Sequence, residues 1–292
     1  MTERRCVLTF PEYRDAGEAL ARALCAPCAP VGLHRFPDGE SRVRIPVQPI
    51  DHAVVCRSLF YPNDKLIELL LTIQTLRQSG VGRITLVAPY LCYMRQDAAF
   101  APGEVISQRV IGRFLAAQAD EIITVDPHLH RVRRLEDVVP ARRAVAVSAA
   151  PLIAAFLRQQ AQDAVLVGPD SESEQWVRAI AEIEHLRYAV AEKQRSGDRS
   201  VQVTLDPGSL SGEEVVLVDD IASTGRTVAA AAARVVQCGA RTVKAFVSHA
   251  LFADDAEACI RAAGITEVWS TDSIPHPSNR IPLAELLAEQ IR

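Results

Sequence analysis

The sequence predicts an α/β protein built from mostly parallel sheets that are flanked by helices. Short apolar segments of strand length alternate with segments of helical periodicity in both halves of the chain. Residues 215–218 are continuously apolar, which is typical of a strand buried on both faces of a parallel sheet. With 292 residues, of which 49% are hydrophobic, the chain can fill the cores of two domains.

The first half contains five segments of strand character, at residues 5–10, 41–45, 53–58, 83–89 and 121–125. Helices are expected at residues 16–24 and 104–118. A third helix is indicated by a stripe of apolar residues at helical spacing that ends before Gly80: Leu66, Leu69, Leu70, Ile73 and Leu76. This stripe predicts core packing rather than a site.

The second half repeats this alternation of strands and helices. Residues 145–151 are expected to connect the two domains, which we place at 1–148 and 149–292. A helix should follow, and strands are predicted at 164–167, 215–218, 242–248 and 267–270. Helices are expected to end at Gly239 and Gly264, and the tail carries an amphipathic helix.

Composition argues against several classes of function. A net charge of −4 indicates no general surface for polyanions, so we expect no nucleic-acid partner. No apolar run reaches 18 residues and the N-terminus is charged, so we expect no membrane span or signal peptide and a cytoplasmic location.

The seven cysteines are an odd number and scattered, which favours reduced thiols. Cys25 and Cys28 form a CxxC that could be half a zinc site or a redox pair. No second such motif accompanies it, so we interpret the two cysteines as small residues in a loop.

The segment 214–239 is the most informative stretch of the chain. Its apolar strand is followed by Asp219 and Asp220, then by a loop of small and hydroxyl residues, and then by an Ala/Val-rich helix. Free backbone N–H groups at a helix N-terminus, together with the helix dipole, favour a phosphate. The loop consists of Ser223, Thr224, Gly225, Arg226 and Thr227.

The two carboxylates need a different ligand, because they would repel a phosphate. Sugar hydroxyls and Mg²⁺ both suit carboxylates. The segment therefore predicts a site for a phosphorylated sugar. The alternative is a capped turn between strand and helix with an acidic flank.

Three groups of polar residues follow predicted strands or turns in the first half. The turn 36–40 contains Phe36, Asp38, Gly39 and Glu40, which could recognise a base or form an ordinary hairpin. Residues 90–97 hold two Tyr, an Arg, a Gln and an Asp at a strand end, where ligands bind in open parallel sheets. The alternative for 90–97 is a surface loop with a local ion pair.

Asp126, His128 and His130 follow the strand 121–125 and invite a metal interpretation. We favour His128 as a neighbour of Mg²⁺ or phosphate and leave His130 open. Residues 192–199 are a basic loop that could close over phosphates and neutralise developing charge, or could be a solvated hairpin.

The segment 214–239 resembles the phosphoribosyl-pyrophosphate loop shared by phosphoribosyltransferases and ribose-phosphate pyrophosphokinases. Four motifs occur here in the same order as in the pyrophosphokinase family: FPDGE at 36–40, PYxxYxRQD at 89–97, DxH at 126–128 and VDDxxSTGxT at 218–227. Phosphoribosyltransferases share only the last. The resemblance covers nearly the whole chain and implies two phosphoribosyltransferase-type domains, an N-terminal one for ATP and a C-terminal one for ribose 5-phosphate.

The resemblance also implies a role for each motif residue. The positions expected to bind ATP are Phe36, Asp38, Gly39, Glu40, Arg95, Gln96 and Asp97. His128 and Asp170 resemble the Mg²⁺ positions, Lys193 the catalytic lysine and Arg195 a catalytic phosphate clamp. The positions expected to bind ribose 5-phosphate are Arg195, Asp219, Asp220, Ser223, Thr224, Gly225, Arg226 and Thr227.

The implied reaction transfers the diphosphoryl group of ATP to the 1-hydroxyl of ribose 5-phosphate and gives phosphoribosyl pyrophosphate and AMP. The resemblance also implies a role in supplying nucleotide biosynthesis and a homodimer or larger homo-oligomer. Two departures from the family pattern are the acidic stretch 171–174, where Glu172 could cap a helix, and Arg226 in place of a Gly. A phosphoribosyltransferase and a catalytically silent regulatory homologue remain alternatives.

Overall fold

The structure, a computed structural model, describes residues 3–46, 48–195, 201–204 and 210–291, without the side chains of 192–195 and 201–204. The chain divides into two compact units. The first comprises Met1–Val147, Ser273–Pro275 and Pro282–Arg292. The second comprises Ser148–Asp272 and His276–Ile281.

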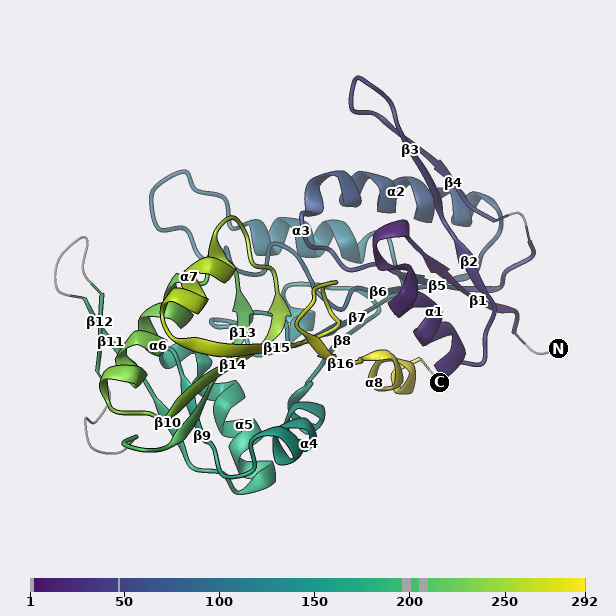
Figure 1. Ribbon diagram of the computed structural model, residues 1–292. Coiled ribbons are helices and arrows are strands. Elements are labelled where there is room, and N and C mark those ends of the chain that lie inside the picture. The colour runs from purple at the N-terminus through teal and green to yellow at the C-terminus, as the bar shows by residue number, and fades with distance from the viewer. Residues whose placement is uncertain (1–2, 47, 196–200, 205–209, 292) are drawn as a thin grey trace. The chain divides into compact units, whose positions relative to one another are not determined.

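The first unit is built on a six-stranded sheet whose strands are all parallel, in the order β2-β1-β5-β6-β7-β8 (Figure 1). These strands are β1 (Arg5–Thr9), β2 (Cys28–Pro30), β5 (His52–Cys56), β6 (Arg83–Val87), β7 (Glu121–Val125) and β8 (Arg143–Val147). An antiparallel hairpin of β3 (Gly32–Arg35) and β4 (Ser41–Arg44) leaves the sheet between β2 and β5.

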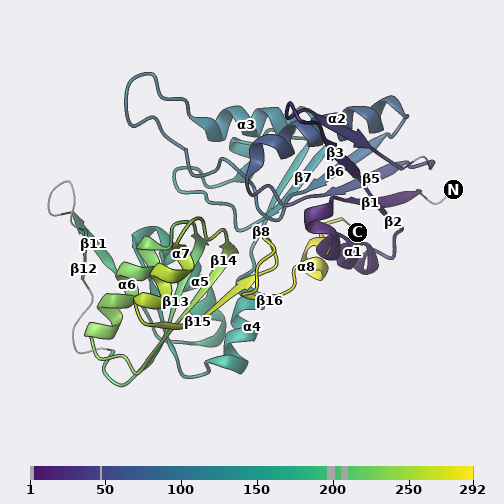
Figure 2. The ribbon, with the colours of Figure 1, turned by 45° about the horizontal axis from the view of Figure 1, so that its top comes forward.

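Helices cover both faces of this sheet (Figure 2). On one face lie α2 (Pro62–Gln78) and α3 (Ser107–Ala116), and on the other lie α1 (Arg14–Ala23) and α8 (Ala284–Glu289). Connections between parallel strands are right-handed, so the face that a helix covers depends on the direction in which its connection crosses the sheet. The connections β5 to β6 and β6 to β7 run in one direction, and the connection β1 to β2 runs in the other, so their helices lie on opposite faces. The apolar stripe of α2 packs on the strands, and Leu69 and Ile73 are fully buried.

The second unit has the same architecture, with a parallel sheet in the order β10-β9-β13-β14-β15-β16. Its strands are β9 (Val165–Gly168), β10 (Tyr188–Val190), β13 (Glu214–Ala222), β14 (Thr242–Ala250), β15 (Ile265–Thr271) and β16 (Asn279–Ile281). Its helices are α4 (Ala150–Gln160), α5 (Glu174–Glu184), α6 (Arg226–Gln237) and α7 (Ala256–Ala262). A hairpin of β11 (Glu192–Arg195) and β12 (Val201–Thr204) again separates the second strand of the unit from the third.

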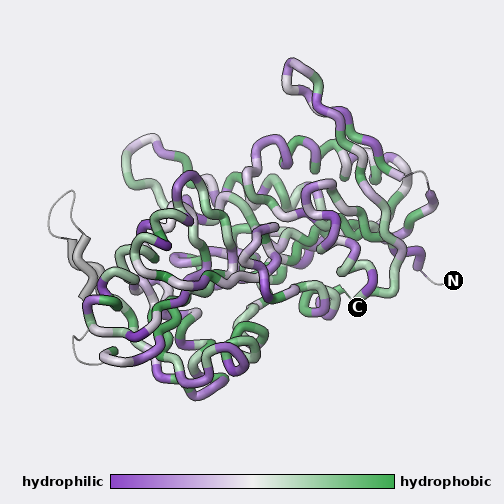
Figure 3. Tube along the Cα trace, viewed as in Figure 1, coloured by the Kyte–Doolittle hydropathy of each residue, from purple (hydrophilic) through white to green (hydrophobic). Residues whose placement is uncertain are grey.

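The predicted fold class is therefore confirmed, and the two units share one topology. Figure 3 shows the apolar central strands of both sheets, with hydrophilic residues concentrated on connections and outer helix faces. Short 3-10 turns at Pro11–Tyr13, Leu135–Asp137 and Ser171–Ser173 complete the connections. Within the described residues, no helix is both long enough and apolar enough to cross a bilayer.

Three details differ from the sequence expectations. The expected second domain ran to residue 292, but Pro282–Arg292 belongs to the first unit. Leu287 of α8 and Ile291, which follows the helix, are buried, and α8 packs on α1. The expected connection at 145–151 is mostly regular structure, since β8 ends at Val147 and α4 begins at Ala150. Cys28 begins edge strand β2 rather than lying in a loop, and both cysteines of the CxxC are free thiols.

Candidate active site

The loop after β13 is built as the sequence indicates. Residues 215–218 of β13 are 0–1% exposed, because β13 lies between the parallel neighbours β9 and β14. The strand ends at Ala222, and α6 begins at Arg226 after only three residues. The backbone N–H groups of the first turn of α6 have no partner within the helix, so they can bind an anion.

Gly225 is the residue that makes this sharp turn possible. It lies in the left-handed region, with φ of 69°. A Cβ at this position would lie 2.9 Å from Ile260 Cδ1 and 3.0 Å from Ala256 O, so only glycine fits without strain. Hydrogen bonds from Phe252 N to Ala222 O and from Ala253 N to Ser223 O, both 2.9 Å, fix the start of the loop.

The loop is open to a ligand where the sequence predicts contact with one. Thr224, Arg226 and Thr227 are exposed, and Ser223 is half-buried. Among the side chains that the structure describes, none caps the N-terminus of α6. The hydroxyl groups and amides of this loop are therefore available to a phosphate.

Three carboxylates gather beside the loop. Asp219 and Asp220 lie on β13, and Asp170 follows the neighbouring strand β9, so parallel pairing brings all three to the same edge of the sheet. Burial raises the pKa of Asp219 well above its usual value, and the charges of Asp220 and Asp170 raise it further. Such a cluster suits a divalent cation or sugar hydroxyls, since oxygen ligands are those that Mg²⁺ prefers.

Asp170 also determines how the acidic stretch 171–174 folds. Its Oδ1 accepts hydrogen bonds from Glu172 N at 3.1 Å and Ser173 N at 3.3 Å, and Ser173 Oγ closes a capping box. The N-cap is therefore Asp170, and the expectation that Glu172 could be the cap is wrong. The acidic residues instead fill the first turns of the helical segment, where the dipole favours them.

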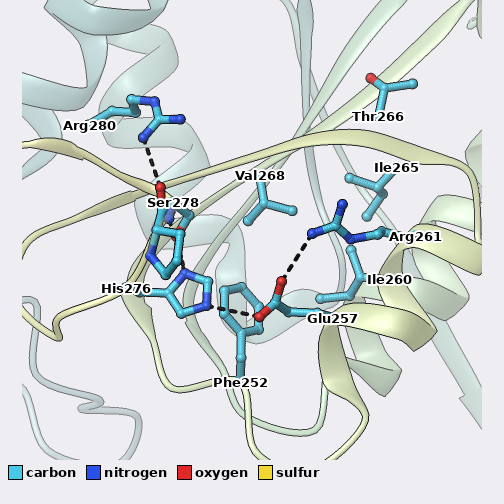
Figure 4. A pocket seen from close by; sticks show the side chains of 11 residues that line it. Phe252, Glu257, Ile260, Arg261, Ile265, Thr266, Val268, His276, Ser278 and Arg280 are labelled. Carbon is cyan, nitrogen blue, oxygen red and sulfur yellow. Dashed lines mark hydrogen bonds and ion pairs between the residues drawn. The ribbon is translucent and has the colours of Figure 1, made fainter.

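The unit also contains a cavity of about 190 Å³ between α7, β15 and the segment 276–280 (Figure 4). Glu257 points toward its centre and is held by Arg261 Nη2 at 3.1 Å and His276 Nε2 at 3.2 Å. These contacts lower the pKa of Glu257. Because Ile260 lines this cavity and also lies under Gly225, the cavity backs onto the loop.

Lys193 and Arg195, the predicted catalytic residues, lie on β11. Their backbone pairs in antiparallel register with Val203 and Val201 of β12. Their side chains lie outside the described part of the structure, so their roles stay predictions.

The 36–40 turn of the first unit joins β3 to β4. Phe36 N bonds to Glu40 O at 2.8 Å, and Gly39 has φ of 93°, as a tight turn requires. Phe36 is 39% exposed and packs edge-on against His34, with ring centroids 4.8 Å apart. Its face is thus available for stacking, beside the carboxylates of Asp38 and Glu40, both of which are exposed.

The loop after β6 presents Arg95 and anchors Asp97. Arg95 is exposed, Gln96 Nε2 donates to Ala98 O at 3.1 Å, and Asp97 is 9% exposed. Asp97 Oδ1 accepts from Arg131 Nη1 at 2.5 Å. This ion pair joins the loop that contains Arg95, Gln96 and Asp97 to the segment that follows β7. The sequence did not reveal the contact, because Arg131 is not part of any of the four motifs.

His128 follows β7 at the carboxyl edge of the sheet. It is half-buried, and His130 is its neighbour, with their Nε2 atoms 2.6 Å apart. His130, for which the sequence analysis assigned no role, therefore forms a pair with His128. His128 and Asp170, the two predicted metal ligands, come from different units.

The first unit has a counterpart of the loop after β13, but side chains fill it. Residues 57–61 connect β5 to α2, and Tyr61 precedes α2 with φ of 48°, as Gly225 precedes α6. Here Arg57 is 2% exposed and binds Glu12 Oε1 at 2.8 Å and Glu68 Oε2 at 2.5 Å. The equivalent position thus holds an internal ion network.

The two units with one topology and the open loop after β13 define a protein of the phosphoribosyltransferase architecture. Residues 6–119 match the model of the N-terminal domain of ribose phosphate pyrophosphokinase. Residues 141–264 match the phosphoribosyl transferase domain.

Two similar relatives are named ribose-phosphate pyrophosphokinase. That of Methanopyrus kandleri is 35% identical over 98% of this chain and 98% of its own. That of Thermococcus kodakarensis is 36% identical over 94% of each. The crystal structure of phosphoribosylpyrophosphate synthetase from Mycobacterium smegmatis superimposes with a TM-score of 0.85 and 25% identity over 99% of this chain and 98% of its own. The chain belongs to the ribose-phosphate pyrophosphokinase family of enzymes, as the motifs predict.

Proposed function

We propose that the chain transfers the diphosphoryl group of ATP to the 1-hydroxyl of ribose 5-phosphate. The hydroxyl oxygen attacks the β-phosphorus of ATP, and the bond from that phosphorus to the oxygen bridging to the α-phosphate breaks. The products are 5-phospho-α-D-ribose 1-diphosphate, AMP and the proton of the hydroxyl. Full-length similarity to relatives named for this activity supports the proposal.

One observation carries the proposal most directly: the loop 223–227 leaves hydroxyls and amides open beside three carboxylates. The 5-phosphate fits the positive N-terminus of α6, and the ribose hydroxyls fit Asp219, which is partly exposed, whereas Asp220 is only 2% exposed and is not open to a ligand. Arg226 adds a cation to the phosphate site where relatives often carry glycine. It begins α6 without requiring positive φ, so its departure from the family pattern is compatible with the turn.

In the nucleotide half, Phe36 is suited to stack on the adenine, and Asp38 and Glu40 to accept hydrogen bonds from it. Arg95 and Gln96 are candidates for the nucleotide phosphates, whereas Asp97 acts through Arg131 by holding the loop in place. Gly39 shapes the turn.

Mg²⁺ fits the donor set, because burial and the negative charges of Asp220 and Asp170 raise the pKa of Asp219, and a bound cation would offset that repulsion. The candidate ligands are Asp170 in the second unit and His128 in the first, each taken within its own unit, and bound Mg²⁺ would supply charge neutralisation for the triphosphate. Positioning and charge stabilisation then account for catalysis, since phosphoryl transfer requires little covalent work from the protein. Lys193 and Arg195 are assigned to the charge that builds in the transition state.

The test is to mix the pure protein with ATP, Mg²⁺ and ribose 5-phosphate and to identify the nucleotide product. We expect AMP, and we expect EDTA to abolish its formation and added Mg²⁺ to restore it. ADP as the product would indicate single phosphoryl transfer and would contradict the proposal. Absence of any product would favour the silent regulatory homologue.

The same proposal places the enzyme in the supply of nucleotide precursors. It also includes a homodimer or larger homo-oligomer and a cytoplasmic location. Sedimentation velocity of the pure protein tests the assembly, and a single species at 31.8 kDa would contradict it.

A further inference from the structure

The residues on either side of the 36–40 turn are both bonded to helix α2. Arg35, the last residue of β3, donates through Nη1 to Asp64 Oδ2 at 2.6 Å. Ser41, the first residue of β4, donates through Oγ to Glu68 Oε1 at 3.0 Å. Asp64 and Glu68 lie four residues apart and therefore share one face of α2.

The two contacts differ in burial and hence in strength. The side chains of Arg35 and Asp64 are 64% and 57% exposed, and an exposed ion pair of this kind contributes little. The side chain of Glu68 is only 11% exposed. Its hydrogen bond to Ser41 is charge-assisted and shielded from water, so it is the stronger of the two.

Glu68 is itself held from behind by Arg57. Arg57 Nη2 donates to Glu68 Oε2 at 2.5 Å, Nε donates to Glu12 at 2.8 Å, and Nη1 donates to Lys65 O at 3.2 Å. The guanidinium also lies 3.9 Å from the centroid of the Phe10 ring. All three guanidinium nitrogens of Arg57 are bonded, so the position of Arg57 is fixed. Its bond to Oε2 of Glu68 orients that carboxylate so that Oε1 accepts from Ser41.

Ser41 is the first residue after the turn. Glu40, which precedes it, closes the turn by accepting from Phe36 N at 2.8 Å. A shift of Ser41 therefore moves Glu40 and, through this bond, Phe36. We propose that Glu68, oriented by Arg57, is a positioning residue that fixes the 36–40 turn through Ser41 so that the turn can bind the adenine nucleotide.

This inference rests on the proposed function, because it takes the turn to be part of the ATP site. The contact of Ser41 should affect the position of the turn and not the stability of the hairpin. The apolar side of the hairpin, with the paired residues Leu33 and Val43, packs on the core of the first unit independently of Ser41. Loss of the Ser41 hydroxyl should therefore loosen the turn without unfolding the hairpin.

Ser41→Ala tests the inference, since it removes the hydroxyl and leaves the buried Arg57–Glu68 pair intact. We expect KM for ATP to rise about 10-fold, the size of effect that loss of one hydrogen bond to a charged group produces. KM for ribose 5-phosphate and kcat should stay within about twofold. Amide hydrogen exchange of residues 36–41, measured without ligand, should accelerate.

Two companion variants make the comparison specific. Ser41→Thr keeps a hydroxyl at the same position and should restore both the exchange rate and KM for ATP. Thr75→Ala removes another hydroxyl from α2, one that donates to Leu71 O within the helix. This control should change neither measurement.

The positioning role is overturned if exchange at 36–41 is unchanged in Ser41→Ala, or if KM rises equally for both substrates. Restoration by Ser41→Thr together with a selective rise for ATP supports it. Failure of the proposed function appears elsewhere, as absence of AMP formation by the wild-type protein. Hairpin exchange in the unliganded chain still reports on the Glu68–Ser41 contact in that case, so the two failures are distinguishable.

Discussion

Gly225 shows how a single backbone angle opens the loop proposed to bind the sugar phosphate. Its φ of 69° and the nearby Ile260 and Ala256 together exclude a side chain. Gly225→Ala should lower the free energy of unfolding by about 2–4 kcal/mol, the sum of a positive-φ penalty and a steric clash, and should raise KM for ribose 5-phosphate. Urea denaturation and steady-state kinetics are the measurements.

The matched control is Gly212→Ala in the same unit. Gly212 also has positive φ, at 76°, but no atom of the described residues lies within 4 Å of its added Cβ. Gly212→Ala should lower the free energy of unfolding by about 1 kcal/mol, because it adds only the cost of a positive φ for a residue with a Cβ. It should leave KM for ribose 5-phosphate unchanged. Equal effects of the two substitutions would contradict the steric argument.

His52 makes the stability of the first unit dependent on pH. It is fully buried on β5, where its Nε2 lies 2.9 Å from Thr85 Oγ1 and its Nδ1 accepts from Arg5 Nε at 3.3 Å. Burial and the nearby positive charge of Arg83 lower the pKa of His52. The ionisable groups around the ring are Glu3, Arg5, Arg83 and Glu121.

Because the folded-state pKa lies below the unfolded value, the unfolded chain takes up a proton first as pH falls. Stability is therefore fully present above the unfolded pKa of about 6.5 and declines below it, by at most about 1.4 kcal/mol per pH unit. Urea unfolding of the wild type and of His52→Gln at pH 7.5 and 5.5 measures this. The wild type should lose more stability than the variant over this interval, and parallel losses would contradict the assignment.

The two hairpins occupy the same place in the two units, between the second and third strands. One carries the 36–40 turn and the other carries Lys193 and Arg195. Each hairpin forms a two-stranded sheet of its own, so the residues of its turn can change without altering the strand pairing of the parallel sheet. The same insertion could thus acquire a different task in each unit.

Lys193→Ala should lower kcat by at least about 10²–10³ and leave the fold intact, because removing one donor to transition-state charge has effects of this size. Steady-state kinetics and circular dichroism measure the two effects. Gln194→Ala, between the two basic residues on β11, is the matched control and should retain turnover. Near-wild-type kcat in Lys193→Ala would remove the lysine from the mechanism.

Helix α8 contributes to the stability of the first unit although it lies at the far end of the sequence. Leu287 is 3% exposed, and Arg143 Nη1 of β8 donates to Gln290 O at 2.9 Å. Leu287→Ala should lower the free energy of unfolding by about 2–4 kcal/mol, as expected for a large-to-small substitution in a core. Glu289→Ala, on the exposed side of α8, should change it by less than about 0.5 kcal/mol, and comparable effects would contradict the packing.

For the molecule as a whole, the proposal assigns one substrate to each unit, and this assignment predicts a division in the kinetics. Asp38→Ala in the first unit should raise KM for ATP by about 10-fold or more, since it removes a hydrogen-bonding carboxylate. Thr224→Ala in the second unit should do the same for ribose 5-phosphate. Initial rates over a matrix of both substrate concentrations separate these effects. A rise in the opposite KM from either variant would contradict the assignment.

Much of the fold could be predicted because its signals are local. The apolar run of β13, the stripe of α2 and the glycines that end helices follow from strand burial and helical periodicity alone. Short edge strands such as β2 and β10 escaped prediction, because three residues carry too little pattern and β2 ends in a proline. The tail was assigned to the wrong unit because sequence position does not reveal which core a helix packs on.

The candidate site divides in the same way. Gly225, the hydroxyl loop and the acidic pair near the end of β13 could be identified from the sequence, since a strand, a tight turn and a helix N-terminus are contiguous in the chain. Contacts between residues that are distant in the sequence could not be identified in this way. Arg131 meets Asp97 from 34 residues away, and Glu68 meets Ser41 from 27 residues away.

The sequence by itself thus determined the class of fold, the order of the motifs and the chemistry that each motif offers. Only the tertiary structure decided that Asp170 caps its own helix and approaches Asp219, that Arg57 fills the first unit's counterpart of the loop after β13, and that α8 completes the first unit. The physical reason is that propensity and periodicity act over a few residues, whereas packing and ion pairing join residues by distance in space, which no spacing along the chain records.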